Sequence, residues 1–227
     1  APAAVSVGEF HSCAIRWGSK SRIECWGAGR TGEVAPFDNY GQGSPPVTTN
    51  FKAVVAGSSF SCGLRAHDGT VLCWGDDQSG QVSGAPAEVT DTDDRNSFRR
   101  LSAGTAHACA IGQQLLNEGK ITCWGETDAA TVQVSGGDYC EVAAGDIHTC
   151  ALRCDTGLAV CWDTFGIWGS LEYEVAPTAS LSAVTAGEDF TCGVYTAGGG
   201  GVCWGVTAGA EFDALFLAPL SAIAAGR

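Results

Sequence analysis

The chain has 227 residues, of which 45% are apolar, and its formal net charge at pH 7 is −13. That apolar content is enough for a packed core and excludes global disorder. The acidic balance argues against a partner that binds through phosphates, because nucleic-acid recognition needs a basic face. The apolar runs are short and interrupted by glycine, which argues against a transmembrane helix. We therefore expect neither a nucleic-acid partner nor membrane insertion.

The cysteine content points to an oxidising environment. The chain has 12 cysteines, an even number, and disulfides at such a density are typical of secreted proteins. The first residues, Ala1–Ala4, show neither a charged segment nor an apolar run, so we interpret them as a mature terminus whose signal peptide has been removed. The prediction is a secreted, extracellular or cell-surface protein, with another oxidising lumen as the alternative.

One phrase recurs five times along the chain. It consists of a small-residue run ending in glycine, a short strand with a cysteine, a turn, and a second strand ending in Cys-Trp. In chain order the five copies span Val5–Gly27, Val54–Gly75, Leu101–Gly125, Val142–Trp162 and Val184–Gly205. The chain ends on Ile223–Arg227, which repeats the opening of the phrase.

The period of the phrase predicts the architecture. The glycines that open the copies are Gly8, Gly57, Gly104, Gly145, Gly187 and Gly226, spaced about 40 to 50 residues apart. Such a period with short alternating strands predicts an all-β propeller or solenoid, and the Gly-containing turns predict hairpins. We expect one domain over 1–227, a β-propeller of about five four-stranded blades, or alternatively part of a larger six- or seven-bladed propeller. The predicted repeats are 5–50, 51–98, 99–139, 140–181, 182–219 and a partial sixth over 220–227.

The cysteines of each copy are predicted to form a disulfide within its hairpin. Facing positions on adjacent antiparallel strands bring Cβ atoms about 4.5–5.5 Å apart, close enough for a bridge. The predicted pairs are Cys13–Cys25, Cys62–Cys73, Cys109–Cys123, Cys150–Cys161 and Cys192–Cys203, and the two remaining residues, Cys140 and Cys154, would pair across the fourth copy. Zinc binding is the weaker alternative, because the chain has no C-x-x-C motif and its cysteines repeat once per unit.

No residue pattern predicts a cofactor, a metal or a catalytic centre. The first-strand position of His11, His107 and His148 is occupied by Phe60 and Phe190 in the other two copies, which favours a packing role. The acidic loop Asp91–Asp94 could ligate a cation, but it lacks the glycine and distal glutamate of a calcium loop, so a solvated loop is favoured. We expect a non-enzyme without cofactor.

Aromatic residues supply the candidate binding positions. The tryptophans that follow the second cysteine form a periodic set, which favours packing between blades over sugar stacking. Trp17 and Trp168 fall outside this register, in a turn and a loop, and are better placed for an exposed contact. The further candidates are Phe165, Tyr173, Phe37 and Tyr40.

The recurring phrase, followed by D-D-Q-S-G-Q-V at Asp76–Val82, resembles the repeats of the regulator of chromosome condensation family. The cysteine pair in each unit is similar to the secreted branch, which includes β-lactamase inhibitory protein II and crinkly-type receptor ectodomains. The resemblance implies a propeller, usually of seven blades, and by itself no particular function. Here five units and the start of another are present.

The expected function is an extracellular protein-binding or structural assembly module. The expected partners are proteins, including self-assembly through the terminal strands Val5–Gly8 and Ile223–Gly226, because an open strand edge pairs with other chains. The first alternative is a lectin-like propeller that binds a glycan through loop tryptophans. A secreted enzyme inhibitor and, last, a hydrolase complete the set of alternatives.

Overall fold

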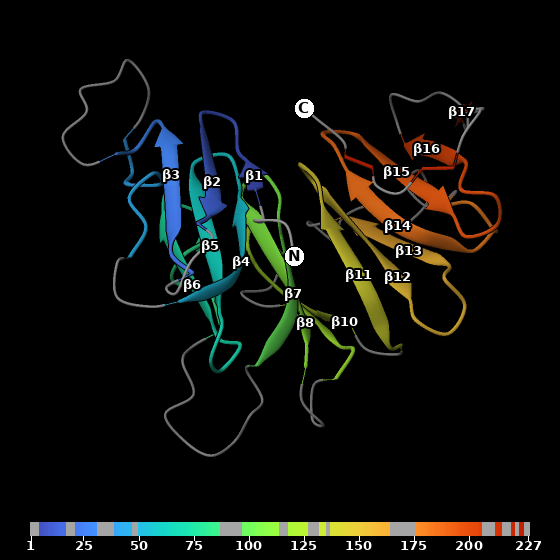
Figure 1. Ribbon diagram of the computed structural model, residues 1–227, viewed down its shortest axis with the longest axis horizontal. Helices are drawn as coiled ribbons and strands as arrows, with labels where there is room; N and C mark the ends of the chain where they lie inside the picture. The colour runs from blue at the N-terminus through green and yellow to red at the C-terminus, as the bar shows by residue number, and fades with distance from the viewer. Residues whose placement is uncertain are drawn as a thin grey trace. The chain divides into compact units, whose positions relative to one another are not determined.

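The computed structural model describes residues 5–16, 21–30, 39–46, 50–86, 97–113, 118–126, 132–134, 137–163, 176–205, 212–214, 219–220 and 223–224. Every regular element in these ranges is a β-strand, and the strands form five antiparallel sheets (Figure 1). No helix long and apolar enough to span a membrane occurs in this part of the chain. The chain divides into two compact units, 1–133 and 134–227.

The first unit holds three sheets. They contain β1 (Val5–Val7), β2 (His11–Ile15) and β3 (Ile23–Gly27); then β4 (Phe51–Ala56), β5 (Phe60–Arg65) and β6 (Val71–Gly75); then β7 (Phe98–Ala103), β8 (His107–Gly112), β9 (Ile121–Gly125) and β10 (Val132–Val134). In each sheet the strands are neighbours in chain order, as expected for a meander of hairpins.

The second unit holds two sheets with the same order. They contain β11 (Tyr139–Ala144), β12 (His148–Arg153) and β13 (Ala159–Asp163); then β14 (Leu181–Ala186), β15 (Phe190–Tyr195), β16 (Gly201–Gly205) and β17 (Phe212–Ala214). In both sheets, the pairing between the first two strands shifts register after the first residue of the first strand. The shift lies between Tyr139 and Glu141 in β11 and between Leu181 and Ala183 in β14.

The all-β prediction is confirmed, and the strand count differs from the expected four. Within the described residues two sheets have four strands and three sheets have three. The segments 31–38, 87–96 and 164–175, which follow β3, β6 and β13, lie outside the described residues. A single domain over 1–227 and the exact repeat boundaries stay predictions.

Each sheet has two chemically distinct faces, because side chains alternate along a strand. One face carries the two cysteines, which lie directly opposite each other, as Cys62 and Cys73 do. We call it the cysteine face. The other carries the residue before the first cysteine and the tryptophan after the second, as Ser61 opposite Trp74. We call it the tryptophan face.

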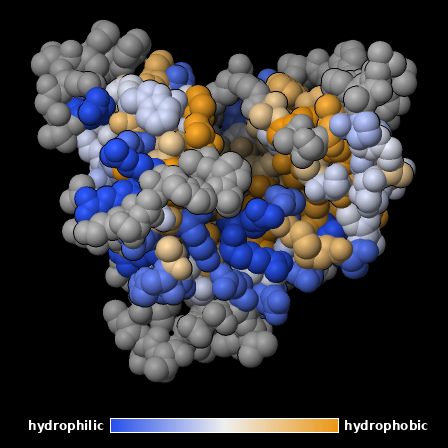
Figure 2. Space-filling model, viewed as in Figure 1, coloured by the Kyte–Doolittle hydropathy of each residue, from blue (hydrophilic) through white to orange (hydrophobic). Residues whose placement is uncertain are grey.

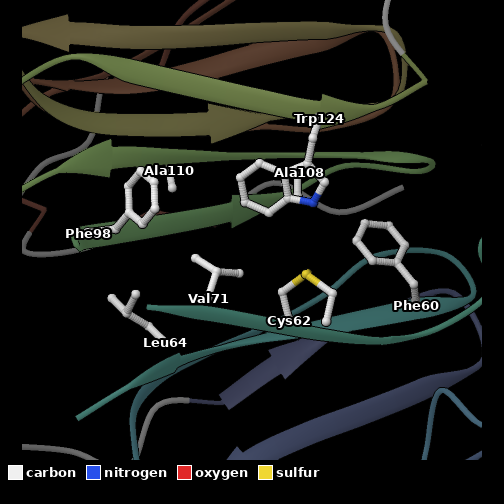
Figure 3. Packing of buried hydrophobic residues seen from close by; sticks show 9 residues of the cluster. Phe60, Cys62, Leu64, Val71, Phe98, Ala108, Ala110 and Trp124 are labelled. Atoms are coloured by element: carbon white, nitrogen blue, oxygen red, sulfur yellow. A yellow bond between two sulfur atoms is a disulfide. The ribbon is translucent and has the colours of Figure 1, made fainter. Parts of the chain in front are cut away.

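The sheets within a unit pack with the cysteine face of one against the tryptophan face of the next. In Figure 3, Phe60, Cys62 and Leu64 of the second sheet face Ala108, Ala110 and Trp124 of the third, in one buried cluster. Equivalent clusters join the first sheet to the second (Cys13, Ile15, Ile23, Cys25, Val54, Trp74) and the fourth to the fifth (Cys150, Leu152, Leu181, Val202, Trp204). The tryptophans are therefore packing residues at these three interfaces, each burying about 150–250 Å².

Six disulfides connect the 12 cysteines in the pairs that the sequence predicts. They are Cys13–Cys25, Cys62–Cys73, Cys109–Cys123, Cys140–Cys154, Cys150–Cys161 and Cys192–Cys203. Five join facing positions of a hairpin; the sixth joins β11 to the turn that follows β12. The two cysteines of each disulfide are 11 to 14 residues apart in the sequence. In the chain-entropy model, closing a loop of this length stabilises the folded state by about 3 kcal/mol.

The glycines that open three copies of the phrase, Gly8, Gly57 and Gly145, are required by close packing between sheets, because a Cβ at each would clash with the carbonyl oxygen of the equivalent glycine in the next copy. A Cβ at Gly57 would lie 2.7 Å from the carbonyl oxygen of Gly104 in the next sheet and would also overlap the ring of Phe60. We predict that Gly57→Ala lowers the free energy of unfolding by about 1–3 kcal/mol, because overpacking strains the interface. Gly200→Ala is the control, since its Cβ would meet only Tyr195 at 3.7 Å. Equal stability of the two variants in urea unfolding would contradict this view of the glycine.

Candidate functional site

Two turns with the same construction lie at the ends of the first two sheets of the first unit. They follow β3 and β6 and contain Gly41-Gln42 and Gly80-Gln81, and we call them the Gly-Gln turns, 39–46 and 76–86. Both glycines have positive φ, 84° and 75°, which a residue with a side chain rarely adopts. In each turn the glutamine Oε1 accepts a hydrogen bond from the backbone N–H two residues earlier, at 2.9 Å from Tyr40 N and 2.8 Å from Ser79 N.

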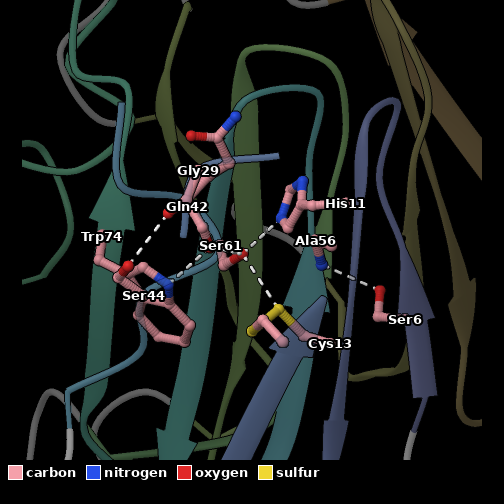
Figure 4. Close-up of a disulfide and its surroundings, with 10 residues drawn as sticks. Ser6, His11, Cys13, Gly29, Gln42, Ser44, Ala56, Ser61 and Trp74 are labelled. Carbon is pink, nitrogen blue, oxygen red and sulfur yellow. Dashed lines mark hydrogen bonds between the residues drawn. A yellow bond between two sulfur atoms is a disulfide. The ribbon is translucent and has the colours of Figure 1, made fainter. Parts of the chain in front are cut away.

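A hydrogen bond joins each Gly-Gln turn to the tryptophan of the next sheet. The indole Nε1 of Trp74 donates to the carbonyl oxygen of Gln42 at 2.9 Å (Figure 4), and Nε1 of Trp124 donates to that of Gln81 at 3.1 Å. Both glutamines are fully buried. The tryptophans therefore contribute both packing area and a hydrogen bond that fixes the turn of the preceding sheet.

Acidic side chains stabilise the second turn. The Asp77 carboxylate accepts from the backbone N–H groups of Val82 at 2.9 Å and Ser83 at 2.8 Å, and from the Ser83 hydroxyl at 3.1 Å. Partial burial, which raises the pKa of Asp77, is outweighed by these hydrogen bonds, so its pKa is lowered. Asp76 accepts from Nε2 of Gln81 at 3.0 Å. The turn is consequently preformed, and the lowered pKa of Asp77 keeps this carboxylate ionised at neutral pH.

The two Gly-Gln turns meet at an exposed tyrosine. Nε2 of Gln78 donates to the hydroxyl oxygen of Tyr40 at 3.5 Å, and Tyr40 is 37% exposed. Asn39, Asp77 and Gln78 are exposed beside it. We call these four residues the paired-turn surface. It offers an aromatic ring, two amides and a carboxylate on a backbone whose conformation is already fixed, which lowers the entropy cost of binding another protein.

Hydrophilic side chains dominate the surface around the first unit in the view of Figure 2, and apolar side chains reach it in smaller groups. Within the described residues no group of three or more His, Cys, Asp or Glu side chains converges as a metal site would require. The side chains of the paired-turn surface, a phenol, two amides and a carboxylate, are suited to hydrogen bonding and aromatic contact.

The buried histidines connect neighbouring sheets. Nε2 of His11 lies 2.7 Å from the Ser61 hydroxyl, and that hydroxyl donates its proton to the Gln42 carbonyl at 3.2 Å (Figure 4). Nε2 of His11 therefore donates to that hydroxyl, and burial lowers the pKa of His11 to about 4, so the imidazole is neutral at pH 7. In the second unit, Nε2 of His148 lies 2.9 Å from Oγ1 of Thr191. These are structural contacts, in agreement with the packing role inferred from the sequence.

Of the six aromatic binding candidates, only Tyr40 lies in the described part of the chain. The other five, Trp17, Phe37, Phe165, Trp168 and Tyr173, lie outside it, as do the loop Asp91–Asp94 and two residues of Ile223–Gly226, Ala225 and Gly226. Their roles stay predictions. His67 is exposed, and its Nε2 lies 3.1 Å from the Asp68 carboxylate.

Sequence reasoning missed the two buried glutamines and the hydroxyl partners of the histidines. A signal for the glutamines was present, since Gly-Gln follows Cys-Trp-Gly in the first two copies at Gly41-Gln42 and Gly80-Gln81. The hydroxyl partners could have been found only by comparing neighbouring copies. A copy with a histidine is followed by a copy with Ser61 or Thr191 before its first cysteine, whereas the copy with Phe60 is followed by one with Ala108.

Comparison with known proteins gives the same architecture. Residues 51–81 match the regulator of chromosome condensation (RCC1) repeat. The entire ectodomain of the Physcomitrella patens receptor kinase CR4 is 30% identical, with a TM-score of 0.66 over 88% of this chain and 49% of that one. The CRINKLY ectodomain of the Arabidopsis thaliana receptor kinase ACR4 is 27% identical, with a TM-score of 0.66 over 89% of this chain and 64% of that one.

Yeast RCC1 (Prp20), solved with Kap60, shares the fold at 18% identity, with a TM-score of 0.61 over 87% of this chain and 54% of that one. The chain thus spans about half to two thirds of the length of these solved structures. The repeat match, the cysteine-paired sheets and the similarity to two receptor ectodomains indicate the same type of repeat. The chain is built from repeats of the regulator of chromosome condensation type, and its sheets are blades of the β-propeller kind.

Proposed function

We propose that the chain is an extracellular, non-enzymatic protein-binding module whose contact site includes the paired-turn surface. The observation that carries this proposal is the exposed Tyr40–Gln78 contact held on two turns that are themselves fixed by buried glutamines. A rigid exposed tyrosine is a typical anchor of protein interfaces, because it supplies contact area at low entropy cost.

The comparisons support this class of function. The two most identical of the three solved relatives are receptor ectodomains, and yeast RCC1 was solved bound to the protein Kap60. Six disulfides favour an oxidising location, and the ectodomain relatives favour the cell exterior. The net charge of −13 favours a partner with a basic contact face.

We predict that Tyr40→Ala weakens capture of the partner about tenfold, equivalent to ~1.4 kcal/mol. The measurement is cross-linked affinity capture from the native extracellular fluid, followed by a titration of the captured protein against purified wild type and variant. His67→Ala is the control, since His67 is also exposed but lies in a different turn.

Equal affinity of the Tyr40→Ala variant and wild type would contradict the assignment of the site. Recovery of the chain alone at every concentration would contradict the protein-binding function itself. A glycan-array signal from the same preparation, with no captured protein, would favour the lectin-like alternative instead.

A further inference from the structure

The disulfide Cys140–Cys154 differs from the other five, because it lies outside the repeated phrase. Both of its cysteines are exposed, whereas each of the other disulfides has at least one buried cysteine. A disulfide is opened by a thiolate that must reach one of its sulfur atoms, and exposed disulfides are the ones that react readily. Of the six disulfides, this one is therefore the most accessible to thiol exchange.

The elements next to this disulfide belong to the second unit. It joins the first strand of the fourth sheet, β11, to the turn after β12 (Figure 1). Cys154 follows Cys150 and Leu152 at even spacing, so it continues the cysteine face, which packs against the fifth sheet of the same unit. The turn is held there by Leu181, whose backbone N–H donates to the carbonyl oxygen of Gly157 at 2.8 Å. The disulfide thus lies on the side of the fourth sheet that faces its own unit.

The sheet does not need this disulfide to close its end. The backbone N–H of Cys154 donates to the carbonyl oxygen of Asp138 at 2.8 Å. The same hydrogen bond closes three other sheets at 2.9 Å with no disulfide beside it, joining Ala66 to Asn50, Gln113 to Ser97 and Thr196 to Ser180. The bulge position of Cys140 is occupied in those sheets by Lys52, Arg99 and Ser182. We therefore expect the fourth sheet to stay folded when the disulfide opens, with Cys150–Cys161 still joining β12 to β13.

Acidic residues outnumber basic ones around this disulfide. Asp138, Glu141 and Asp155 lie within two residues of one of its cysteines, and Arg153 is the one cation in that range of the sequence. The second unit as a whole has 11 acidic and two basic residues, a net charge of −9. An attacking thiolate is itself an anion, so this charge repels it unless the thiol also carries a cationic group.

We propose that Cys140–Cys154 is a thiol-exchange site for a thiol with a positive charge close to its sulfur, and that it opens while the fourth sheet stays folded. The thiolate forms a bond to one sulfur of the pair as the bond between the two cysteines breaks. The other sulfur leaves as a thiolate and takes a proton from water. The product is a mixed disulfide and one free thiol, and the exchange needs no further oxidant or reductant. The site is separate from the paired-turn surface, and its test needs no captured partner, so the two proposals fail independently.

The test treats the folded, fully disulfide-bonded chain with cysteamine, a cationic thiol, or with 2-mercaptoethanesulfonate, an anionic one, at equal thiolate concentration. N-ethylmaleimide traps the freed thiols, and peptide mapping by mass spectrometry gives the rate for each disulfide. Each rate is divided by the rate of the same thiol with a small neutral disulfide, which removes the intrinsic difference between the two reagents. We expect Cys140–Cys154 to open about tenfold faster than any other pair. Cysteamine should open it about threefold faster than the sulfonate at low ionic strength, and this preference should disappear in about 1 M sodium chloride.

Two variants show whether the local charge causes the preference. Asp155→Asn removes one negative charge next to Cys154 and retains an oxygen that can accept from the Thr156 hydroxyl, as Oδ1 of Asp155 does at 3.3 Å. This variant is expected to lower the preference for cysteamine. Glu188→Gln is the matched control, because it removes the same charge in the β14–β15 loop, at the other end of the strands. It should leave the preference unchanged. The peptide acetyl-Lys-Cys-Lys-amide, used in place of cysteamine, shows whether a polypeptide thiol also reaches the site.

Three outcomes would overturn the proposal. One is another disulfide that opens as fast as Cys140–Cys154. Another is an equal rate for the two thiols at low ionic strength, since this would show that the acidic surroundings do not select the thiol. The third is a loss of hydrogen-exchange protection of the β12 amides when the pair opens, because the sheet would then unfold with its disulfide.

Discussion

Replacing both Cys150 and Cys161 with alanine is expected to lower the free energy of unfolding of the second unit by about 4 kcal/mol. Removing the cross-link restores unfolded-state entropy worth about 3 kcal/mol for a separation of 11 residues. The remaining ~1 kcal/mol reflects lost packing, because Cys150 is fully buried in the cluster with Leu152 and Trp204. Hydrogen exchange of the β12 and β15 amides measures the effect within the unit.

The second disulfide of the same sheet is a matched control. Cys140 and Cys154 are exposed and separated by 14 residues, so their replacement by alanine removes a cross-link of nearly the same entropy without removing buried atoms. The expected loss is about 3 kcal/mol. Two results would contradict the packing role assigned to the cysteine face. One is a larger loss of unfolding free energy for the Cys140–Cys154 replacement than for the Cys150–Cys161 replacement, and the other is no loss for either.

Acid is expected to weaken the interfaces that contain histidine. Burial lowers the pKa of His11 from 6.5 to about 4, although the backbone of Ser58 opposes this change. Burial also lowers the pKa of His148, although the charges of Asp189 and Asp146 oppose it. The unfolded chain thus binds protons that the folded chain does not, so stability falls as the pH drops from about 6.5 towards 4.

The size of this effect is testable by urea unfolding at pH 7 and pH 5. For His11 alone we expect a loss of about 2 kcal/mol at pH 5, from a shift of pKa between 6.5 and about 4. The Asp68 and Asp77 pKa values are lowered from 3.8, so the stability that depends on these carboxylates is lost only at lower pH.

The chain itself provides the control for the acid effect. Phe60 and Ala108 occupy the positions of His11 and Ser61 at the next interface, without a titratable group. The double variant His11→Phe, Ser61→Ala should therefore retain its pH 7 stability more fully at pH 5 than wild type. The same pH 7 to pH 5 difference in both proteins would show that His11 does not carry the acid sensitivity.

The fold was largely predictable from the repeated phrase. The two cysteines of each copy identify facing positions of a hairpin, and Gly8, Gly57 and Gly104 mark equivalent starts, so the five sheets and the cysteine pairs follow from spacing. The register shift after Phe51 in β4 was not predictable, because a bulge depends on how the strand meets its neighbour.

The candidate site was less predictable, because it forms between copies. Tyr40 was one of several loop aromatics, and its contact with Gln78 depends on how two turns from different sheets meet. The buried roles of Gln42 and Gln81 depend on tryptophans in the following sheet. The residue pattern within one copy carries no information on contacts between residues of different copies. The packing role of the tryptophans was predictable, because they recur at the same position of every copy.

Hydroxyl-radical footprinting of the protein with its captured partner tests the proposed function most directly. The oxidation rate of the Tyr40 side chain, 37% exposed in the free chain, is expected to fall severalfold on binding, while that of exposed Trp26 stays unchanged. This result would place the partner on the paired-turn surface. Unchanged oxidation of Tyr40 in a saturated complex would contradict the account.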